Sequence, residues 1–184
     1  MKKSQDIYLF IRNMEIRVFF PVFILFFISG VIHAQNIEFS EEFFPKDQKK
    51  RLKEVIREID EGDSYFEAGS RMSYILALDH YLIANNFNPD NALLNYKIGR
   101  CYLMSTEKNK ALRHLKKSYD LKQNAVDDIL FWLGKAYQIS HQPEQAITCY
   151  NNYRAGLSPE SISKYDPLIQ KSINECNNAI LYIK

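Results

Sequence analysis

The feature that most constrains this chain is an internal repeat with a spacing of about 35 residues. The stretch from Asn95 to Leu121 aligns without gaps on the stretch from Leu130 to Gly156. In both, a large apolar residue and a glycine are followed three positions later by a tyrosine, and an alanine follows further on. An earlier, slightly longer copy covers about 46–90. A repeat of this length predicts an array of similar units that bury their apolar faces only against their neighbours.

The positions that the copies share carry the residue types that two antiparallel helices need for close packing. A glycine in the first helix leaves room for the second helix, and an alanine in the second helix does the same from the other side. Tyrosines and apolar residues at helical spacing fill the remaining gap. The predicted packing residues are Gly62, Tyr65, Ala77 and Tyr81 in the first copy, Gly99, Tyr102 and Ala111 in the second, and Gly134, Tyr137, Ala146 and Tyr150 in the third.

This order of a large apolar residue, Leu-Gly, Tyr, Ala, an aromatic residue and Pro resembles the tetratricopeptide repeat. The chain departs from that pattern at Glu58 and Asn95, where a large apolar residue is usual. The resemblance implies an all-α, right-handed α-α superhelix of three helix pairs, at about 46–90, 91–124 and 125–157.

A capping helix is expected to follow the third copy, over residues 158–184. The Ser158-Pro159-Glu160 sequence is typical of a helix start, with a capping serine and a proline at the first helical position. The Asp166-Pro167 pair predicts a break or a kink within this helix, because the residue before a proline avoids the helical conformation.

The N-terminal segment predicts export. Arg17 is followed by an apolar run from Val18 to Ile32 and then by Ala34, which is the pattern of a secretory signal peptide over residues 1–34. The run is short for a membrane span, so an uncleaved anchor is the weaker alternative. Translation could begin at Met1 or at Met14. Export places the protein in the periplasm or at the outer membrane, and no membrane span is expected after cleavage.

Residues 35–45 form a leading segment before the first repeat. Its Phe43 and Phe44 are expected to cover the open apolar end of the first copy. After residue 34 the chain contains 20 basic and 20 acidic residues out of the 24 and 22 of the whole chain. A nucleic-acid binder needs a basic surface, so this neutral balance argues against nucleic acid as a partner.

Candidate catalytic or metal-binding residues are few. His80, His114 and Cys149 occupy the same position in the three copies, but equivalent positions on packed helices are about 9 Å apart, too far to share a metal. Cys101 follows Arg100, which favours a reactive thiol, yet it lies among the packing residues, which favours a buried one. A Cys149–Cys176 disulfide is a further possibility. We expect no enzyme activity, no metal and no cofactor.

The remaining candidate is the concave surface that the first helix of each pair presents in tetratricopeptide arrays. By that resemblance, a protein or peptide partner would bind a groove, although contacts of these residues with the leading segment or the capping helix are an alternative. The predicted groove residues are Asp63 and Phe66 in the first copy, Tyr96, Arg100, Leu103 and Met104 in the second, and Phe131, Lys135 and Gln138 in the third.

The order of features also resembles the N-terminal region of Gram-negative envelope proteins that carry a β-propeller and an OmpA-like domain, some of them in the type IX secretion and gliding apparatus. The phrases EEFFPKD, FNPDNALLNYKIGRCYL, LSPESI and INECNNA carry this resemblance. It implies a non-catalytic scaffold that binds a subunit of an envelope complex. The alternatives are a truncated or split anchoring fragment of such a protein and, less favoured, a thiol enzyme that uses Cys101.

Overall fold

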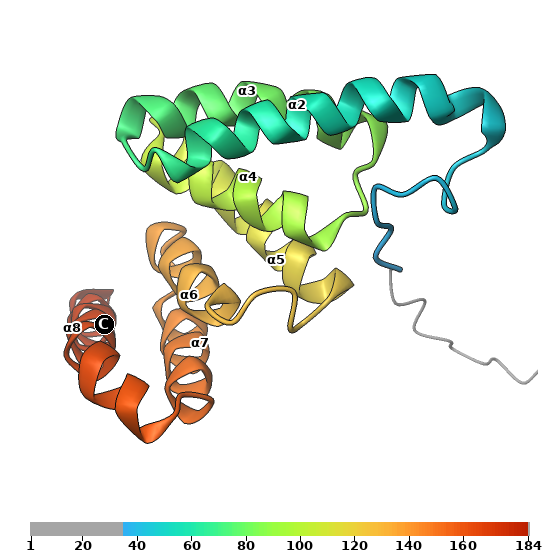
Figure 1. Ribbon diagram of the computed structural model, residues 1–184. Coiled ribbons are helices and arrows are strands. Elements are labelled where there is room, and N and C mark those ends of the chain that lie inside the picture. The colour runs from blue at the N-terminus through green and yellow to red at the C-terminus, as the bar shows by residue number, and fades with distance from the viewer. Residues whose placement is uncertain (1–34, 184) are drawn as a thin grey trace, which may run out of the picture. The chain divides into compact units, whose positions relative to one another are not determined.

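The computed structural model describes residues 35–183, and the predicted signal peptide lies outside them. The described residues form seven α-helices and no strand. Figure 1 shows them following one another as three antiparallel pairs and a final helix. The pairs are α2 (Lys49–Glu67) with α3 (Arg71–Phe87), α4 (Ala92–Met104) with α5 (Ala111–Leu121), and α6 (Ile129–Ile139) with α7 (Pro143–Ala155); α8 (Pro159–Ile183) follows. The predicted fold class is confirmed.

The glycine of each first helix lies against one side chain of its paired helix. A Cβ atom built on Gly62 would come within 2.7 Å of Tyr81, one on Gly99 within 2.5 Å of Leu115, and one on Gly134 within 2.6 Å of Tyr150. These distances leave no room for a methyl group. Each glycine thus lies in close contact with the second helix of its pair, the role that the repeat pattern predicts for it.

The predicted alanines are all fully buried, but the tyrosines after the glycines differ among the copies. Tyr102 is buried and stacks on His114, with ring centroids 5.6 Å apart. Tyr65 makes the same stack on His80 at 5.7 Å but is 39% exposed. The prediction that Tyr65 is a buried packing residue is therefore wrong. The first pair has no preceding repeat to cover this side chain.

Local signals define several helix ends. The side chain of Asn91 accepts a hydrogen bond from the Leu94 amide at the start of α4. Pro143 occupies the first turn of α7, where its missing N–H costs nothing. Gly69 joins α2 to α3 in a left-handed conformation with φ of 68°, and Ser70 caps α3. The turn between α2 and α3 is short, so the extra residues of the first copy lie in its two helices.

The leading segment is attached to the turn between α3 and α4. The Ile37 amide donates to the Asp90 carbonyl at 2.7 Å, and the side-chain amides of Asn88 and Asn91 both donate to the Ile37 carbonyl at 2.9 Å. Phe44 packs on Phe87 with a centroid distance of 4.9 Å. One of the two predicted phenylalanines thus covers the first pair, whereas Phe43 stays exposed.

Helix α8 continues through Pro167, so of the predicted break or kink the break does not occur, and the kink stays a prediction. A proline inside a helix costs one hydrogen bond and some steric strain, about 3 kcal/mol. Beyond it, Ile169, Ser172 and Cys176 lie one helical turn apart and are fully buried as α8 packs against α7. This packing keeps the chain helical past the proline.

Candidate protein-binding surface

The first helices of the three pairs are joined by polar contacts where a groove was predicted. Asp63 of α2 accepts hydrogen bonds from the Tyr81 hydroxyl at 2.6 Å and from the Lys97 ammonium at 2.6 and 2.8 Å. Burial and the neighbouring Asp63 carboxylate raise the pKa of Tyr81, so its hydroxyl stays a donor. Asp63 is thus engaged by its own chain, and it links the first pair to the second.

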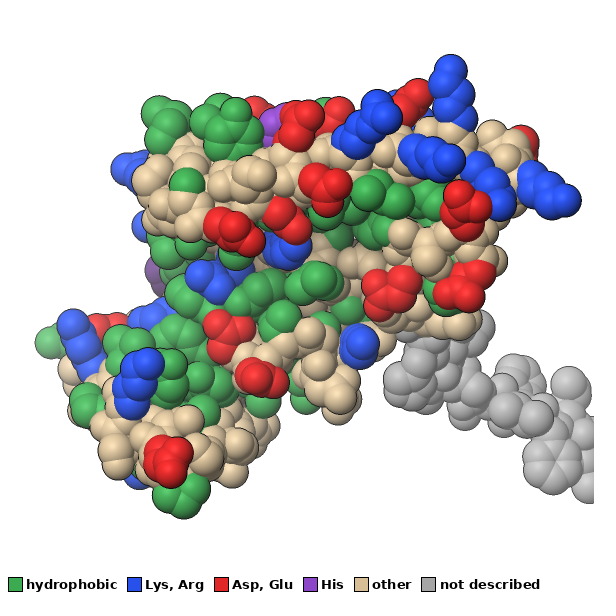
Figure 2. All heavy atoms as spheres, in the orientation of Figure 1, with side chains coloured by type: hydrophobic (Ala, Val, Ile, Leu, Met, Phe, Trp, Pro, Cys, Tyr) green, Lys and Arg blue, Asp and Glu red, His purple; other side chains and the backbone are tan. Residues whose placement is uncertain are grey.

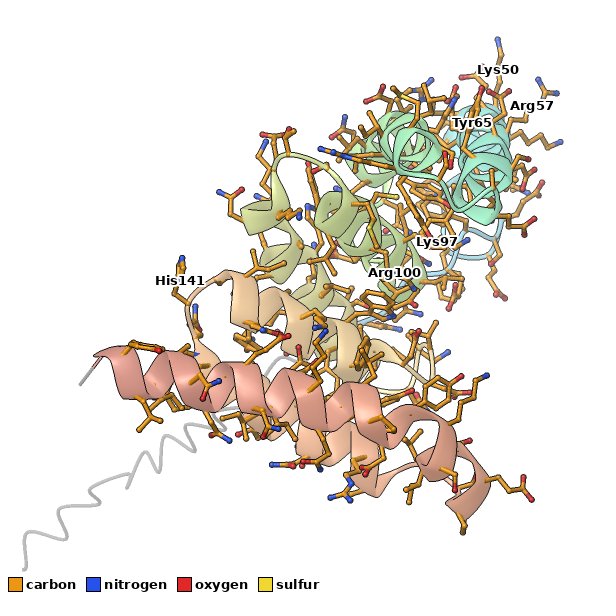
Figure 3. The ribbon with its side chains drawn as sticks, turned by 90° about the vertical axis from the view of Figure 1, so that its left-hand side faces the viewer. Lys50, Arg57, Tyr65, Lys97, Arg100 and His141 are labelled. Atoms are coloured by element: carbon orange, nitrogen blue, oxygen red, sulfur yellow. The ribbon has the colours of Figure 1, made fainter. Side chains whose placement is uncertain are left out.

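Arg100 makes the corresponding link between the second and third pairs. Its guanidinium lies 3.7 Å from the ring centroid of Trp132 and donates to the Tyr96 hydroxyl at 2.6 Å. Asp128 accepts from both Tyr96 and Trp132 at 2.7 Å, and its carboxylate is 3.8 Å from Arg100. The Arg100 side chain is only 14% exposed, and Figure 3 shows it toward the middle of the molecule, near Lys97.

We call these connected side chains the inner ladder. Phe66 completes it, with its ring 5.6 Å from the Arg100 guanidinium. An arginine held by one aromatic stack, one hydrogen bond and one carboxylate has little left to offer a partner. The inner ladder consists of Asp63, Phe66, Tyr96, Lys97, Arg100, Asp128 and Trp132.

Three predicted groove residues are buried, and their assignment to an open groove is wrong. Tyr96, Leu103 and Phe131 are 6–8% exposed and belong to the apolar core. The prediction placed them by their distance from the glycine, but Phe131 packs against α7 and α8, and Tyr96 reaches Asp128 at the start of α6.

The other predicted groove residues have diverse surroundings. Gln138 accepts a hydrogen bond from Tyr150 and donates one to Glu175 of α8, so the last helix covers it, which is the alternative raised by the sequence. The Lys135 ammonium lies 5.9 Å from the Tyr150 ring. Met104 is half-buried at the edge of a shallow hollow of about 310 Å³. These residues do not form one continuous groove.

The histidines of the repeat explain the two departures from the tetratricopeptide pattern. In the first pair His80 lies 2.8 Å from Glu58, and in the second His114 lies 2.9 Å from the Asn95 amide oxygen. Asn95 is fully buried and also donates to the carbonyls of Pro89 and Asn91. Each polar residue at the usually apolar position thus has a histidine partner across the pair.

His114 is held neutral by its surroundings. Burial, and then the charges of Arg113 and Lys117, lower its pKa to about 4. A neutral imidazole can donate from Nδ1 to Asn95 and needs no counter-ion.

One cluster of described residues could hold a metal ion: Glu58, Glu61 and His80. Sequence reasoning missed it because it combines two helices. Cys149, which shares the histidine position in the third copy, is buried and has no part in it. The simpler role of His80 is the hydrogen bond to Glu58.

All three cysteines are free and buried. Burial raises the pKa of Cys101 to about 12 and that of Cys149 to about 11, and it raises the pKa of Cys176 as well. Arg100 lowers the pKa of Cys101 but does not offset burial. The disulfide between Cys149 and Cys176 is not formed, and a protonated, buried thiol is a poor nucleophile.

An open site lies instead where α6, α7 and α8 meet. A cleft of about 240 Å³ is lined by Trp132, Tyr153, Tyr165, Leu168, Phe131 and Asp128. Leu168 is 46% exposed, although it is a large apolar side chain. A second hollow of about 660 Å³ shares Asp128, Tyr153 and Tyr165 with the first. We call the two together the cap cleft.

The charge in the cap cleft is acidic. Of all its lining residues only Asp127 and Asp128 carry charge. Asp128 is engaged in the inner ladder, whereas Asp127 is exposed and makes no ion pair with any described residue. Burial, followed by the two aspartates, raises the pKa of Tyr153. A cationic group would therefore find a complementary charge here.

Sequence reasoning missed Lys97, Asp128, Trp132, Tyr165 and Leu168. The carboxylate of Asp128 serves as the acceptor between two repeats. Tyr165 and Leu168 lie on the capping helix, which the repeat pattern does not cover. The signal available was Trp132, the single tryptophan of the chain, one turn after an aspartate.

The succession of helix pairs defines a tetratricopeptide-like helical repeat protein. No protein-family model and no curated protein matches the chain. Among solved structures, the chain is similar to the crystal structure of the MamA protein, with a TM-score of 0.55 and 20% sequence identity, over 74% of this chain and 73% of that one. At this identity the likeness shows the fold alone.

Within residues 35–183, no helix has both the length and the apolar character required to cross a membrane.

Proposed function

We propose that the protein is a non-catalytic scaffold of the bacterial cell envelope that binds a segment of a partner protein in the cap cleft. The observation that carries this proposal is the cleft at the end of the array, where the exposed Leu168 lies beside the partly buried Trp132 and Tyr165. Aromatic side chains in partly desolvated pockets supply much of the binding energy at protein interfaces. The tetratricopeptide-like fold supports a scaffold because such arrays present extended surfaces to partners.

The occupant that fits best is an extended peptide with a large apolar side chain next to a lysine or arginine. The apolar side chain would pack between Trp132 and Leu168. The basic group would lie near Asp127, the free carboxylate of the cleft. A cationic side chain also interacts favourably with the faces of Tyr153 and Tyr165.

The absence of catalysis is part of the proposal. Cys101, the best nucleophile candidate of the sequence, is buried with a raised pKa. The charged residues of the inner ladder are paired with one another, and Asp128, which also lines the cap cleft, accepts hydrogen bonds from Tyr96 and Trp132.

The envelope location rests on the N-terminal sequence, which is typical of an export signal. A relationship to the envelope proteins with a β-propeller and an OmpA-like domain also belongs to the proposal, and only the sequence phrases quoted above support it. A partner within an envelope complex follows from the same resemblance.

Peptide selection tests the site. Residues 33–184, which form a compact unit of their own, would be used to select binders from a random displayed-peptide library. We expect the selected peptides to combine a large apolar residue with a basic one. Their affinity should fall at least about tenfold in Leu168→Glu, because a carboxylate would be added to an acidic, apolar cleft.

Leu181→Glu is the matched control, because Leu181 is also an exposed leucine of α8, at 71%, but does not line the cleft. Its affinity for the same peptides should stay within about twofold. Equal losses in the two variants, or no loss in Leu168→Glu, would refute the cap cleft as the binding site.

A further inference from the structure

The first half of α2 carries a row of basic side chains along one exposed face. Lys46, in the short turn of 3-10 helix before α2, is followed by Lys50, Lys53 and Arg57 at spacings of four, three and four residues. All four are exposed, and none of them forms an ion pair with another described residue. We call these four residues the basic stripe. Figure 2 shows Lys and Arg side chains gathered over this end of α2.

Helix stability does not account for the basic stripe. Lys53 and Arg57 are like charges four residues apart, an arrangement that destabilises a helix. The first turn of α2 contains basic residues and no acidic one, which opposes the helix macrodipole. Apart from Glu54, which is paired with Arg51, the acidic residues of the same helix lie in its second half, at Glu58, Asp60, Glu61, Asp63 and Glu67. Such separation of charge is better explained by an anionic partner.

The geometry favours a flat partner. Lys50, Lys53 and Arg57 extend over about 11 Å along α2, and Lys46 precedes them in the 3-10 turn at the start of this helix. Figure 3 shows Lys50 and Arg57 at the outer edge of the molecule, away from Lys97 and Arg100. Phe43, an exposed aromatic residue, precedes the row by three positions and could enter a lipid headgroup layer.

The position of the basic stripe in the sequence favours a membrane over an acidic protein or a nucleic acid. Lys46 lies 14 positions after Ile32, the last residue of the apolar N-terminal run. Fourteen residues reach at most about 50 Å. Clusters of lysine and arginine close to a membrane-directed segment are typical of sites that bind anionic lipids, and this argument applies to the form of the protein that keeps its N-terminal run.

We propose that the basic stripe binds the headgroups of anionic phospholipids and holds the repeat array against a membrane surface. The cap cleft is formed by α6, α7 and α8 and contains no residue of the stripe. A partner and a membrane can therefore be bound by different residues. This inference does not depend on the peptide-binding proposal.

Vesicle co-sedimentation of residues 33–184 tests the inference. The probes are vesicles of phosphatidylcholine alone and vesicles in which one third is phosphatidylglycerol. We expect binding only to the anionic vesicles, with a loss at high ionic strength. The variant K46Q/K50Q/K53Q/R57Q should bind at least about tenfold more weakly, because each basic residue near the surface contributes several-fold.

The control variant K108Q/K110Q/K116Q/K122Q removes the same charge from exposed lysines of the second pair. It should bind within about twofold of the parent protein, and circular dichroism would verify that both variants are folded. Equal loss in the two variants would show a net-charge effect and overturn the inference. Failure to bind anionic vesicles, or equal binding to neutral ones, would also overturn it, as would stripe-dependent binding to polyglutamate or DNA without binding to vesicles.

Discussion

The inner ladder and the cap cleft are both built on the inward face of first helices, but one is closed and the other is open. In the inner ladder, Lys97 is paired with Asp63 of the preceding helix pair, and Arg100 is paired with Asp128 at the start of the next pair. In the cap cleft, Trp132 lines an opening together with Tyr165 and Leu168 of α8, and Leu168 is exposed. The inward face of the first helices thus joins neighbouring helix pairs in the middle of the array, whereas at the end of the array it is open to a partner.

This difference teaches that a concave face is not equivalent to a binding site. Contacts between neighbouring first helices can occupy the face with the protein's own side chains. A last repeat has no successor, so its inward face is covered only by the capping helix.

The largest effect is expected for Arg100→Ala. It removes the stack on Trp132 and the donor to Tyr96, and it leaves Asp128 without its cation. We expect the free energy of unfolding to fall by about 2–3 kcal/mol, because a mostly buried charge loses its partners. Urea denaturation measures this quantity.

Lys116→Ala is the control for that experiment. Lys116 forms an exposed ion pair with Asp120 on α5, and such pairs contribute less than about 1 kcal/mol. If Arg100→Ala cost no more than Lys116→Ala, the inner ladder would not be a cohesive element.

The next largest effect is expected to be a loss of stability at low pH, caused by the buried Asn95–His114 contact. The pKa of His114 is about 4 in the folded protein and about 6.5 for an unperturbed histidine. The unfolded chain therefore takes up the proton first, so stability is complete above about pH 6.5 and decreases as the pH falls toward 4. We expect about 2 kcal/mol of loss between pH 7 and pH 5.

His114→Gln isolates this contribution, since glutamine can still donate a hydrogen bond but does not titrate. Urea denaturation at several pH values should give a correspondingly flatter profile for the variant. Identical profiles for both proteins would show that His114 is not responsible for acid sensitivity.

A smaller effect is expected for the contact between Asp63 and Lys97. Both side chains are partly exposed, so solvent screens the pair. A double-mutant cycle with Asp63→Asn and Lys97→Met should give a coupling free energy of about 1 kcal/mol. A coupling near zero would restrict the cohesive part of the inner ladder to Arg100 and its neighbours.

The smallest effect on stability is expected in the cap cleft. Leu168→Glu replaces an exposed side chain and should change the free energy of unfolding by less than about 0.5 kcal/mol. Thermal unfolding monitored by circular dichroism is sufficient to test this. A loss comparable with that of Arg100→Ala would mean that the cleft, too, is structural.

The sequence predicted the repeat packing well because that packing is local. Gly99 and Leu115 belong to one helix pair, and their spacing alone brings them into contact. The partner of Asn95 could also have been found, since Glu58 and His80 repeat the same pair of positions one copy earlier.

The surface was predicted poorly because it depends on contacts between pairs. Whether Tyr96 is buried depends on how closely α6 approaches α4, which no spacing within one copy defines. The helical course through Pro167 depends on the burial of Ile169 and Cys176 against α7. The positions of Tyr165 and Leu168 depend on that helical course, so the cap cleft could not be predicted from the sequence.

The fluorescence of Trp132 tests the central claim most directly, because it is the only tryptophan of the chain and it lines the cap cleft. A library-selected peptide without tryptophan would be titrated into residues 33–184. We predict a saturable change in Trp132 emission, with the same midpoint as binding measured by anisotropy of the labelled peptide. Tight binding by anisotropy with unchanged Trp132 emission would contradict the account, because the partner would then bind elsewhere.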